Sequence, residues 1–157
     1  MKRVLKLSHI RKSFFVTVVA LFALGSAAFA GIDSYEVYLD NKLLIRQSMD
    51  KPLDLKTLAI SDANRSQKLI VKYVQCNAPD QTGKNRSISV RDENGKIIKE
   101  WKFKDATGKG SVMEIPVNEV LALQKNSQGK LALFYSADGM EKTQKLAALG
   151  NANKNHS

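Results

Sequence analysis

The chain has 157 residues, of which 25 are Lys or Arg and 15 are Asp or Glu, so its formal charge is +10. Five of the bases and none of the acids lie in residues 1–30, which leaves residues 31–157 at +5. This modest charge, with acids interspersed among the lysines, lacks the concentrated basic face typical of nucleic-acid-binding domains. We therefore expect no nucleic-acid partner.

The first thirty residues have the pattern of a secretory signal peptide. A positive segment, residues 1–13, precedes an apolar run, residues 14–25, and Ala28-Phe29-Ala30 fits the small-x-small pattern of a cleavage site. We expect cleavage after Ala30 and export of the rest, periplasmic or secreted, without stable insertion in the membrane. An uncleaved anchor is the alternative, because the run from Phe14 to Ala30 has 17 residues and a spanning helix can be that short.

Strands dominate the pattern that follows the signal. Residues 34–47 alternate apolar and polar side chains on both sides of Asp40-Asn41, which predicts a β-hairpin. Residues 53–60 resume the alternation until it slips at Thr57-Leu58, which suggests a bulge or a strand that ends early. Residues 61–66 have the composition of a loop.

The most strand-like run covers residues 67–76. It is apolar on both faces, which predicts a central strand that is covered on both sides. It ends at Cys76, the single cysteine of the chain, which cannot form an internal disulfide. We interpret Cys76 as a packing residue, with an intermolecular disulfide as the alternative.

A second hairpin is expected over residues 86–104, closed by Asp92-Glu93-Asn94-Gly95. Asn94-Gly95 supplies the positive φ of a primed turn. In the second strand, Ile97, Lys99, Trp101 and Phe103 share one parity, and we expect this aromatic face to pack on the core, with the Lys99 stem lying along it.

The remaining elements complete an all-β chain. We expect a loop over 105–110, a strand over 111–115, a short helix over 116–125, a strand over 130–136, a last strand over 141–149 for which a helix is the alternative, and a disordered tail over 150–157. The turn spacing predicts an antiparallel β-sandwich of seven or eight strands, Ig-like or jelly-roll-like. Residues 31–149 then form one domain.

The histidine count excludes several kinds of active site. His9 lies in the signal and His156 in the tail, so residues 31–149 have no imidazole for a Ser-His-Asp or Cys-His site and no histidine ligand for zinc. We expect a non-catalytic module without a cofactor, which binds an unknown protein or envelope component. The alternatives are a small hydrolase with two carboxylates and a carrier of a hydrophobic ligand between the sheets.

Any binding surface is expected in the loops beside the two hairpin strands, around residues 77–85 and 105–110, because their polar and glycine-rich residues are not needed to pack the core. Tyr38 is a further candidate, because it shares a strand face with Glu36 and Asp40 and so reads as an exposed aromatic. The candidate binding residues are Tyr38, Asn77, Asp80, Lys84, Arg86, Lys102 and Lys104.

Overall fold

The computed structural model describes residues 31–76, 78, 83–105 and 112–151. The chain divides into two units, residues 1–30 and 31–157, and the described residues all belong to the second. The expected signal peptide, most of the loop expected after Asp105, and residues 152–157 of the expected tail therefore lie outside the described residues. In the described part of the chain, no helix is long and apolar enough to span a membrane.

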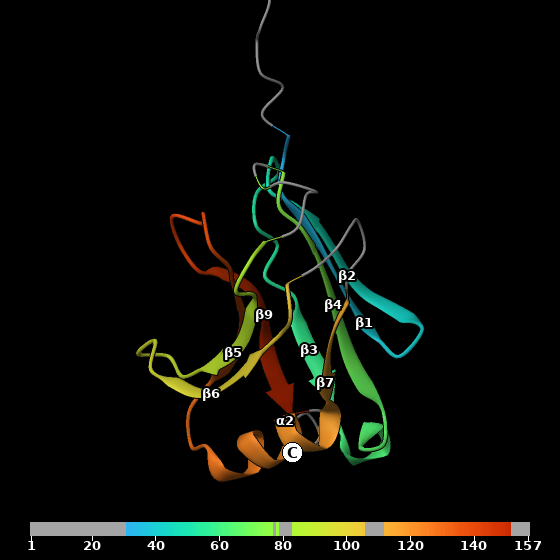
Figure 1. Ribbon diagram of the computed structural model, residues 1–157. Helices are drawn as coiled ribbons and strands as arrows, with labels where there is room; N and C mark the ends of the chain where they lie inside the picture. The colour runs from blue at the N-terminus through green and yellow to red at the C-terminus, as the bar shows by residue number, and fades with distance from the viewer. Residues whose placement is uncertain (1–30, 77, 79–82, 106–111, 152–157) are drawn as a thin grey trace, which may run out of the picture. The chain divides into compact units, whose positions relative to one another are not determined.

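Two β-sheets pack against each other, and a helix lies across one end of them (Figure 1). The first sheet has the order β2-β1-β4-β7 and is antiparallel throughout, with strands β1 (Ser34–Leu39), β2 (Lys42–Ser48), β4 (Lys68–Val74) and β7 (Val112–Pro116). The second has the order β3-β9-β8-β5-β6, with strands β3 (Thr57–Ile60), β5 (Ser87–Arg91), β6 (Ile97–Lys102), β8 (Leu131–Ser136) and β9 (Gln144–Asn151). The predicted β-sandwich is confirmed, with nine strands in the described residues.

The core is formed by the alternate side chains that face the space between the sheets. In β1 the burial alternates residue by residue, and Tyr35, Val37 and Leu39 are the inward set. Tyr73 of β4 stacks on Tyr135 of β8, with ring centroids 4.1 Å apart, so this contact crosses from one sheet to the other. Burial of such apolar and aromatic surface is the main stabilising contribution to a fold of this kind.

Both predicted hairpins are present, but their turns differ in detail. Asp40 adopts φ 49° between β1 and β2, as the Asx pair predicts. Between β5 and β6, only Gly95 has a positive φ, at 80°, and its N–H donates to the carbonyl of Asp92. The prediction of a primed Asn-Gly turn was wrong, because the loop is longer and is held by the Asp92 carboxylate, which accepts from the N–H groups of Asn94 and Lys96.

β3 is shorter than predicted and pairs differently. Residues 53–56 lie outside any strand, and the point where the alternation slips is the start of the strand instead of its end. β3 pairs with β9 in parallel, with Thr57 opposite Ala148, so the second sheet is mixed. Gly150 and Asn151, which were expected in the disordered tail, belong to β9.

β6 lies at the edge of the second sheet, and its residues are largely exposed. Trp101 and Phe103 are half-buried and pack against the core, as expected for their parity. Ile97, at 47% exposed, does not, so the prediction that this whole face enters the core was wrong at its first residue. Lys99 lies along the aromatic ring as predicted, with Nζ 5.9 Å from the Trp101 ring centroid.

The predicted short helix is α2 (Val117–Asn126). Pro116 precedes the helix in an extended conformation instead of occupying its first turn, and ends β7. Val117, Val120 and Leu121 form the buried stripe, as their spacing predicts, and Gln124 extends it. A turn of 3-10 helix, η1 (Asp62–Asn64), contacts α2, and the Nζ of Lys125 lies 3.3 Å from the Asp62 carboxylate.

Candidate functional site

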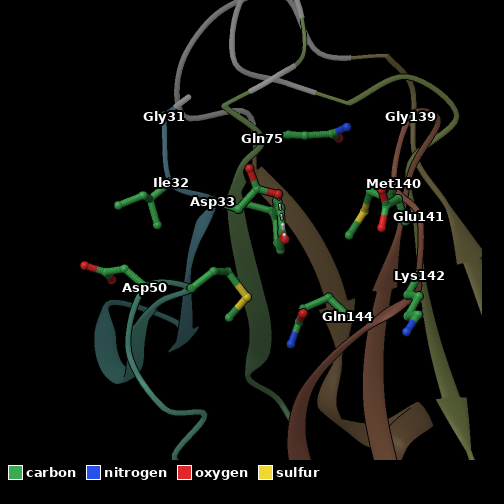
Figure 2. Close-up of a pocket in the computed structure, with 12 residues that line it drawn as sticks. Gly31, Ile32, Asp33, Asp50, Gln75, Gly139, Met140, Glu141, Lys142 and Gln144 are labelled. Atoms are coloured by element: carbon green, nitrogen blue, oxygen red, sulfur yellow. Dashed lines mark hydrogen bonds between the residues drawn. The ribbon is translucent and has the colours of Figure 1, made fainter. Parts of the chain in front are cut away.

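A cleft of about 460 Å³ lies between the segment that leads into β1, the end of β4 and the connection from β8 to β9 (Figure 2). Ile32 and Asp50 lie on one side of it, Met140, Glu141 and Lys142 on the other, and Asp33 and Gln75 between them (Figure 2). The residues that line it are Gly31, Ile32, Asp33, Met49, Asp50, Tyr73, Gln75, Gly139, Met140, Glu141, Lys142 and Gln144. A concave surface with both apolar and polar groups is the usual form of a ligand site.

Asp33 fixes the inner end of the cleft. Its Oδ1 accepts a hydrogen bond from the backbone N–H of Cys76 at 2.9 Å, and its Oδ2 accepts one from the Tyr73 hydroxyl at 3.1 Å. The Cys76 thiol donates to the carbonyl of Ile32 at 2.9 Å. These bonds join the residues before β1 to the end of β4 and to Cys76, which follows it, so this wall is held by side chains that the local fold already positions.

Three tyrosines stack behind this wall. The Tyr73 ring lies between those of Tyr135, at 4.1 Å, and Tyr35, at 6.3 Å. Burial, and then the neighbouring Asp33 carboxylate, raise the pKa of Tyr73 well above its usual value, and burial raises the pKa of Tyr135 to about 12. The Tyr35 hydroxyl donates to the carbonyl of Leu146 at 2.8 Å. Tyr73, which lines the cleft, is therefore uncharged at neutral pH and is backed by the rings of Tyr35 and Tyr135.

Gln75 connects the cleft to the opposite sheet. Its side chain is 3% exposed, and its Nε2 donates to the carbonyl of Asp138 at 3.0 Å, which ties the end of β4 to the turn after β8. Its Oε1 lies beside Gly83, where a Cβ would come within 2.6 Å of that oxygen and 2.9 Å of the Tyr135 hydroxyl. Glycine is required at position 83 by this close approach.

The side chains of the cleft favour a cationic ligand. Three acidic residues, Asp33, Asp50 and Glu141, line it, with one basic residue, Lys142. Both oxygens of Asp33 already accept hydrogen bonds, so Asp50 and Glu141 are the acids available to a ligand. Within the described residues, no group of three or more His, Cys, Asp or Glu side chains could hold a metal ion.

The candidate residues from the sequence lie elsewhere. Arg86, Lys102 and Lys104 come together where β5 and β6 meet the loops that flank them, since Lys102 pairs with Ser87 and the Nη2 of Arg86 donates to the carbonyl of Lys104 at 2.9 Å. The carbonyl of Lys84 instead accepts from the N–H of Asp138 at 2.9 Å. Arg86 is only 4% exposed, so its prediction as a surface residue needs correction: its guanidinium is turned inward to hold this corner of the sheet. Asn77 and Asp80 lie outside the described residues.

Tyr38 is on the outer face of the first sheet and is half-buried there. Its hydroxyl donates to Glu36 Oε2 at 2.6 Å, and the Nζ of Lys72 lies 4.7 Å from the centroid of its ring. Arg46 donates to the other oxygen of Glu36 at 2.7 Å. The bond from Tyr38, with the charge of Arg46, lowers the pKa of Glu36. Tyr38 is thus part of a charged cluster and is only partly accessible.

The sequence analysis missed the residues of the cleft. One signal was available: Gln75 has the parity of Leu69, Val71 and Tyr73, so a buried amide that needs partners could have been inferred at the end of β4. Asp33, Asp50 and Glu141 are each adjacent to strand or turn signals and carry no pattern that brings them together. Their meeting depends on the packing of one sheet on the other.

The comparisons with known proteins add no chemistry to this cleft. No protein-family model matches the chain, and no curated protein gives a significant match to it.

Proposed function

We propose that the chain is an exported, non-catalytic binding module, and that its cleft receives a positively charged group of a protein partner or envelope component. The observation that carries the proposal is the cleft itself, which is lined by the acidic residues Asp50 and Glu141, by Met49 and Met140, and by Tyr73. We infer export from the sequence of residues 1–30, which has the pattern of a secretory signal peptide.

The arrangement is suited to binding because its walls are held before a ligand arrives. The hydrogen bonds of Asp33 and Gln75 restrain both the entry to β1 and the turn after β8. Preorganisation of this kind reduces the entropy lost on association. The exposed carboxylates would then add charge complementarity, which gives specificity and faster association more than raw affinity.

The test uses a short basic peptide of alternating lysine and leucine, titrated into residues 31–157 by calorimetry and by amide chemical shifts. We expect binding that perturbs the amides around Asp33, Gln75 and Met140. Asp50→Asn and Glu141→Gln should each weaken it about two- to fivefold at low salt, the range for one exposed charge pair. Asp54→Asn is the matched control, because Asp54 is exposed but does not line the cleft.

Two results would refute the cleft as the site. One is an equal loss of affinity in the Asp54→Asn control, which would indicate attraction to net charge alone. The other is a set of chemical-shift changes that map to a different surface. Neither result bears on export, which is tested separately by the N-terminus of the secreted chain.

A carboxylate-dependent hydrolase is the second candidate, and the observation that favours it is that Asp50 and Glu141 line one concave surface. Such enzymes need two carboxyl groups at a set separation, about 5–10 Å. Two acids on the strands are engaged elsewhere, since Glu36 bonds Tyr38 and Arg46, and Glu114 bonds Lys68. Turnover of a glycoside by the wild type and its loss in Asp50→Asn would establish the enzyme in place of the binding module.

The carrier of a hydrophobic ligand has less support. It requires an apolar cavity between the sheets, and the inward side chains of both sheets form one cluster of buried residues.

A further inference from the structure

We propose that the free edge of β6 accepts an extended, acidic segment of a partner protein as an additional strand of the second sheet. β6 is the last strand of that sheet, and in the described residues nothing pairs with its outer edge. The edge is separate from the cleft, since no β6 residue lines the cleft. The proposal is therefore independent of the function proposed above.

The hydrogen-bond pattern of the hairpin shows which groups are free at this edge. The N–H of Phe103 donates to the carbonyl of Arg86 at 2.9 Å, so these two residues form a bonded pair. Bonded and non-bonded pairs alternate along an antiparallel ladder. The N–H and C=O groups of Trp101 and Lys99 therefore face β5, and those of Glu100 and Lys102 face away from it. The alternation holds as far as Lys99, because the register shifts between the pairs Val90–Lys99 and Arg91–Ile97, where Ile98 is the extra residue. Glu100 and Lys102 present unpaired donors and acceptors that can receive another strand.

The charge of the edge selects an acidic occupant. Between residues 96 and 104 there are four lysines, Lys96, Lys99, Lys102 and Lys104, and one acid, Glu100. The Nζ of Lys99 forms an ion pair with the Glu119 carboxylate of α2, at 4.0 Å, and that carboxylate also accepts a hydrogen bond from Trp101 Nε1 at 2.8 Å. The other three lysines therefore carry most of the uncompensated charge. A strand that places acids opposite these lysines gains charge complementarity along the whole edge.

The apolar side chains at the start of the strand add contact surface. Ile97 and Ile98 are 47% and 42% exposed. An incoming strand with alternating acidic and apolar residues can cover one of them with an apolar side chain while its acids meet the lysines. The opposing interpretation is that the lysines protect an edge strand against any pairing, a common role of lysine at sheet edges.

The experiment uses a capped octapeptide that alternates glutamate and valine, with the alternating lysine–valine peptide as its charge control. Hydrogen exchange of residues 31–157 is measured with and without each peptide. We expect the acidic peptide to protect the amides of Glu100 and Lys102, and to leave those of Lys99 and Trp101 unchanged, since these are already bonded to β5. Protection of no β6 amide, or equal protection by the lysine–valine peptide, would overturn the proposal.

A pair of variants separates strand addition from charge attraction. Glu100→Pro removes an outward N–H and also removes a negative charge, so attraction alone predicts tighter binding of the acidic peptide, while strand addition predicts at least a tenfold loss. Proline is tolerated on an edge strand where the N–H faces solvent. Glu100→Gln removes the same charge and keeps the N–H, so it should bind at least as well as the wild type. Equal affinities for the two variants would overturn the proposal.

Two further measurements complete the test. Lys102→Glu should weaken the acidic peptide about fivefold, because it converts attraction into repulsion at the edge. Sedimentation of the protein alone should give a monomer; a dimer that is lost in Glu100→Pro would show that a second copy occupies the edge, and would overturn the choice of an acidic partner. The amide spectrum of each variant shows whether it is folded. If a variant does not fold, hydrogen exchange of the wild type still tests the proposal.

Discussion

Removing the hydroxyl of Tyr135 is expected to stabilise the protein. The side chain is 0% exposed, and its hydroxyl has no hydrogen-bond partner in the described part of the chain. A buried polar group without a partner costs about 1–3 kcal/mol of desolvation. Tyr135→Phe keeps the ring and its stack on Tyr73 at 4.1 Å. We expect the free energy of unfolding to rise by about 1 kcal/mol, the low end of that range.

Tyr35→Phe is the matched control, with the opposite sign. Tyr35 belongs to the same stack and is equally buried, but its hydroxyl donates to the carbonyl of Leu146 at 2.8 Å. The substitution leaves that carbonyl without its donor, so we expect a loss of about 1–2 kcal/mol. Each variant loses one tyrosine hydroxyl from the same aromatic stack, and only the hydrogen bonding of that hydroxyl differs. Their stabilities should therefore differ by about 2–3 kcal/mol.

Urea denaturation at neutral pH measures both changes. The slope of the unfolding free energy against urea should stay constant, because neither substitution changes the surface exposed on unfolding by much. The midpoint should rise for Tyr135→Phe and fall for Tyr35→Phe. A midpoint that falls equally in both variants would show that the Tyr135 hydroxyl has a stabilising partner, and would refute the reasoning.

The remaining predictions concern alkaline pH, two glycines and export. Burial raises the folded-state pKa of Tyr135 from the unfolded value near 10 to about 12, so the stability from its protonated form is complete below pH 10 and is lost as the pH rises through about 12. The expected loss is about 2–3 kcal/mol, measured by urea midpoints across this range with phenolate absorbance as the probe. The pKa of Tyr73 is raised further by burial and by the Asp33 carboxylate, so Tyr73 should stay protonated in the folded protein over the same range. In Gly95→Ala the new Cβ meets no atom within 4 Å, so the free energy of unfolding should fall by only about 1 kcal/mol, because of the positive φ. In Gly83→Ala the new Cβ lies 2.4 Å from that of Ala137, so the free energy of unfolding should fall by about 2–3 kcal/mol. Thermal unfolding measures both changes. Mass spectrometry of the exported chain should find Gly31 at its N-terminus, and an intact Met1 on a cytoplasmic chain would refute export.

Most strands could be predicted because their own residues alternate. β1 and β4 each bury every second side chain, and a period of two is visible in any one strand without knowledge of its neighbours. β8 follows the same pattern after its first three residues, which are all buried. The same alternation left Tyr135 and Phe134 undecided, since one of them had to face outward. The structure buries Tyr135 and leaves Phe134 half-buried on the outer face, where the Arg91 guanidinium lies 5.1 Å from its ring centroid.

The errors occur where the state of a residue depends on a distant strand. Ile97 was expected in the core because its parity matches Trp101, but β6 is an edge strand and no described element covers its first residue. The parallel pairing of β3 with β9 has no local signal, because a four-residue segment fits either direction of pairing. The cleft was missed for the same reason: it is lined from segments that are far apart in the sequence.

The position of β9 also has a consequence for the order of folding. β9 lies between β3 and β8, and it is the only described strand that pairs with β3. During synthesis from the N-terminus, β3 must wait for residues 148–151 before it has a partner, so the second sheet closes only when its last strand arrives. Long-range pairing of this kind slows folding. In a chain that is threaded through a membrane before it folds, β3 would stay unpaired until residues 148–151 have crossed.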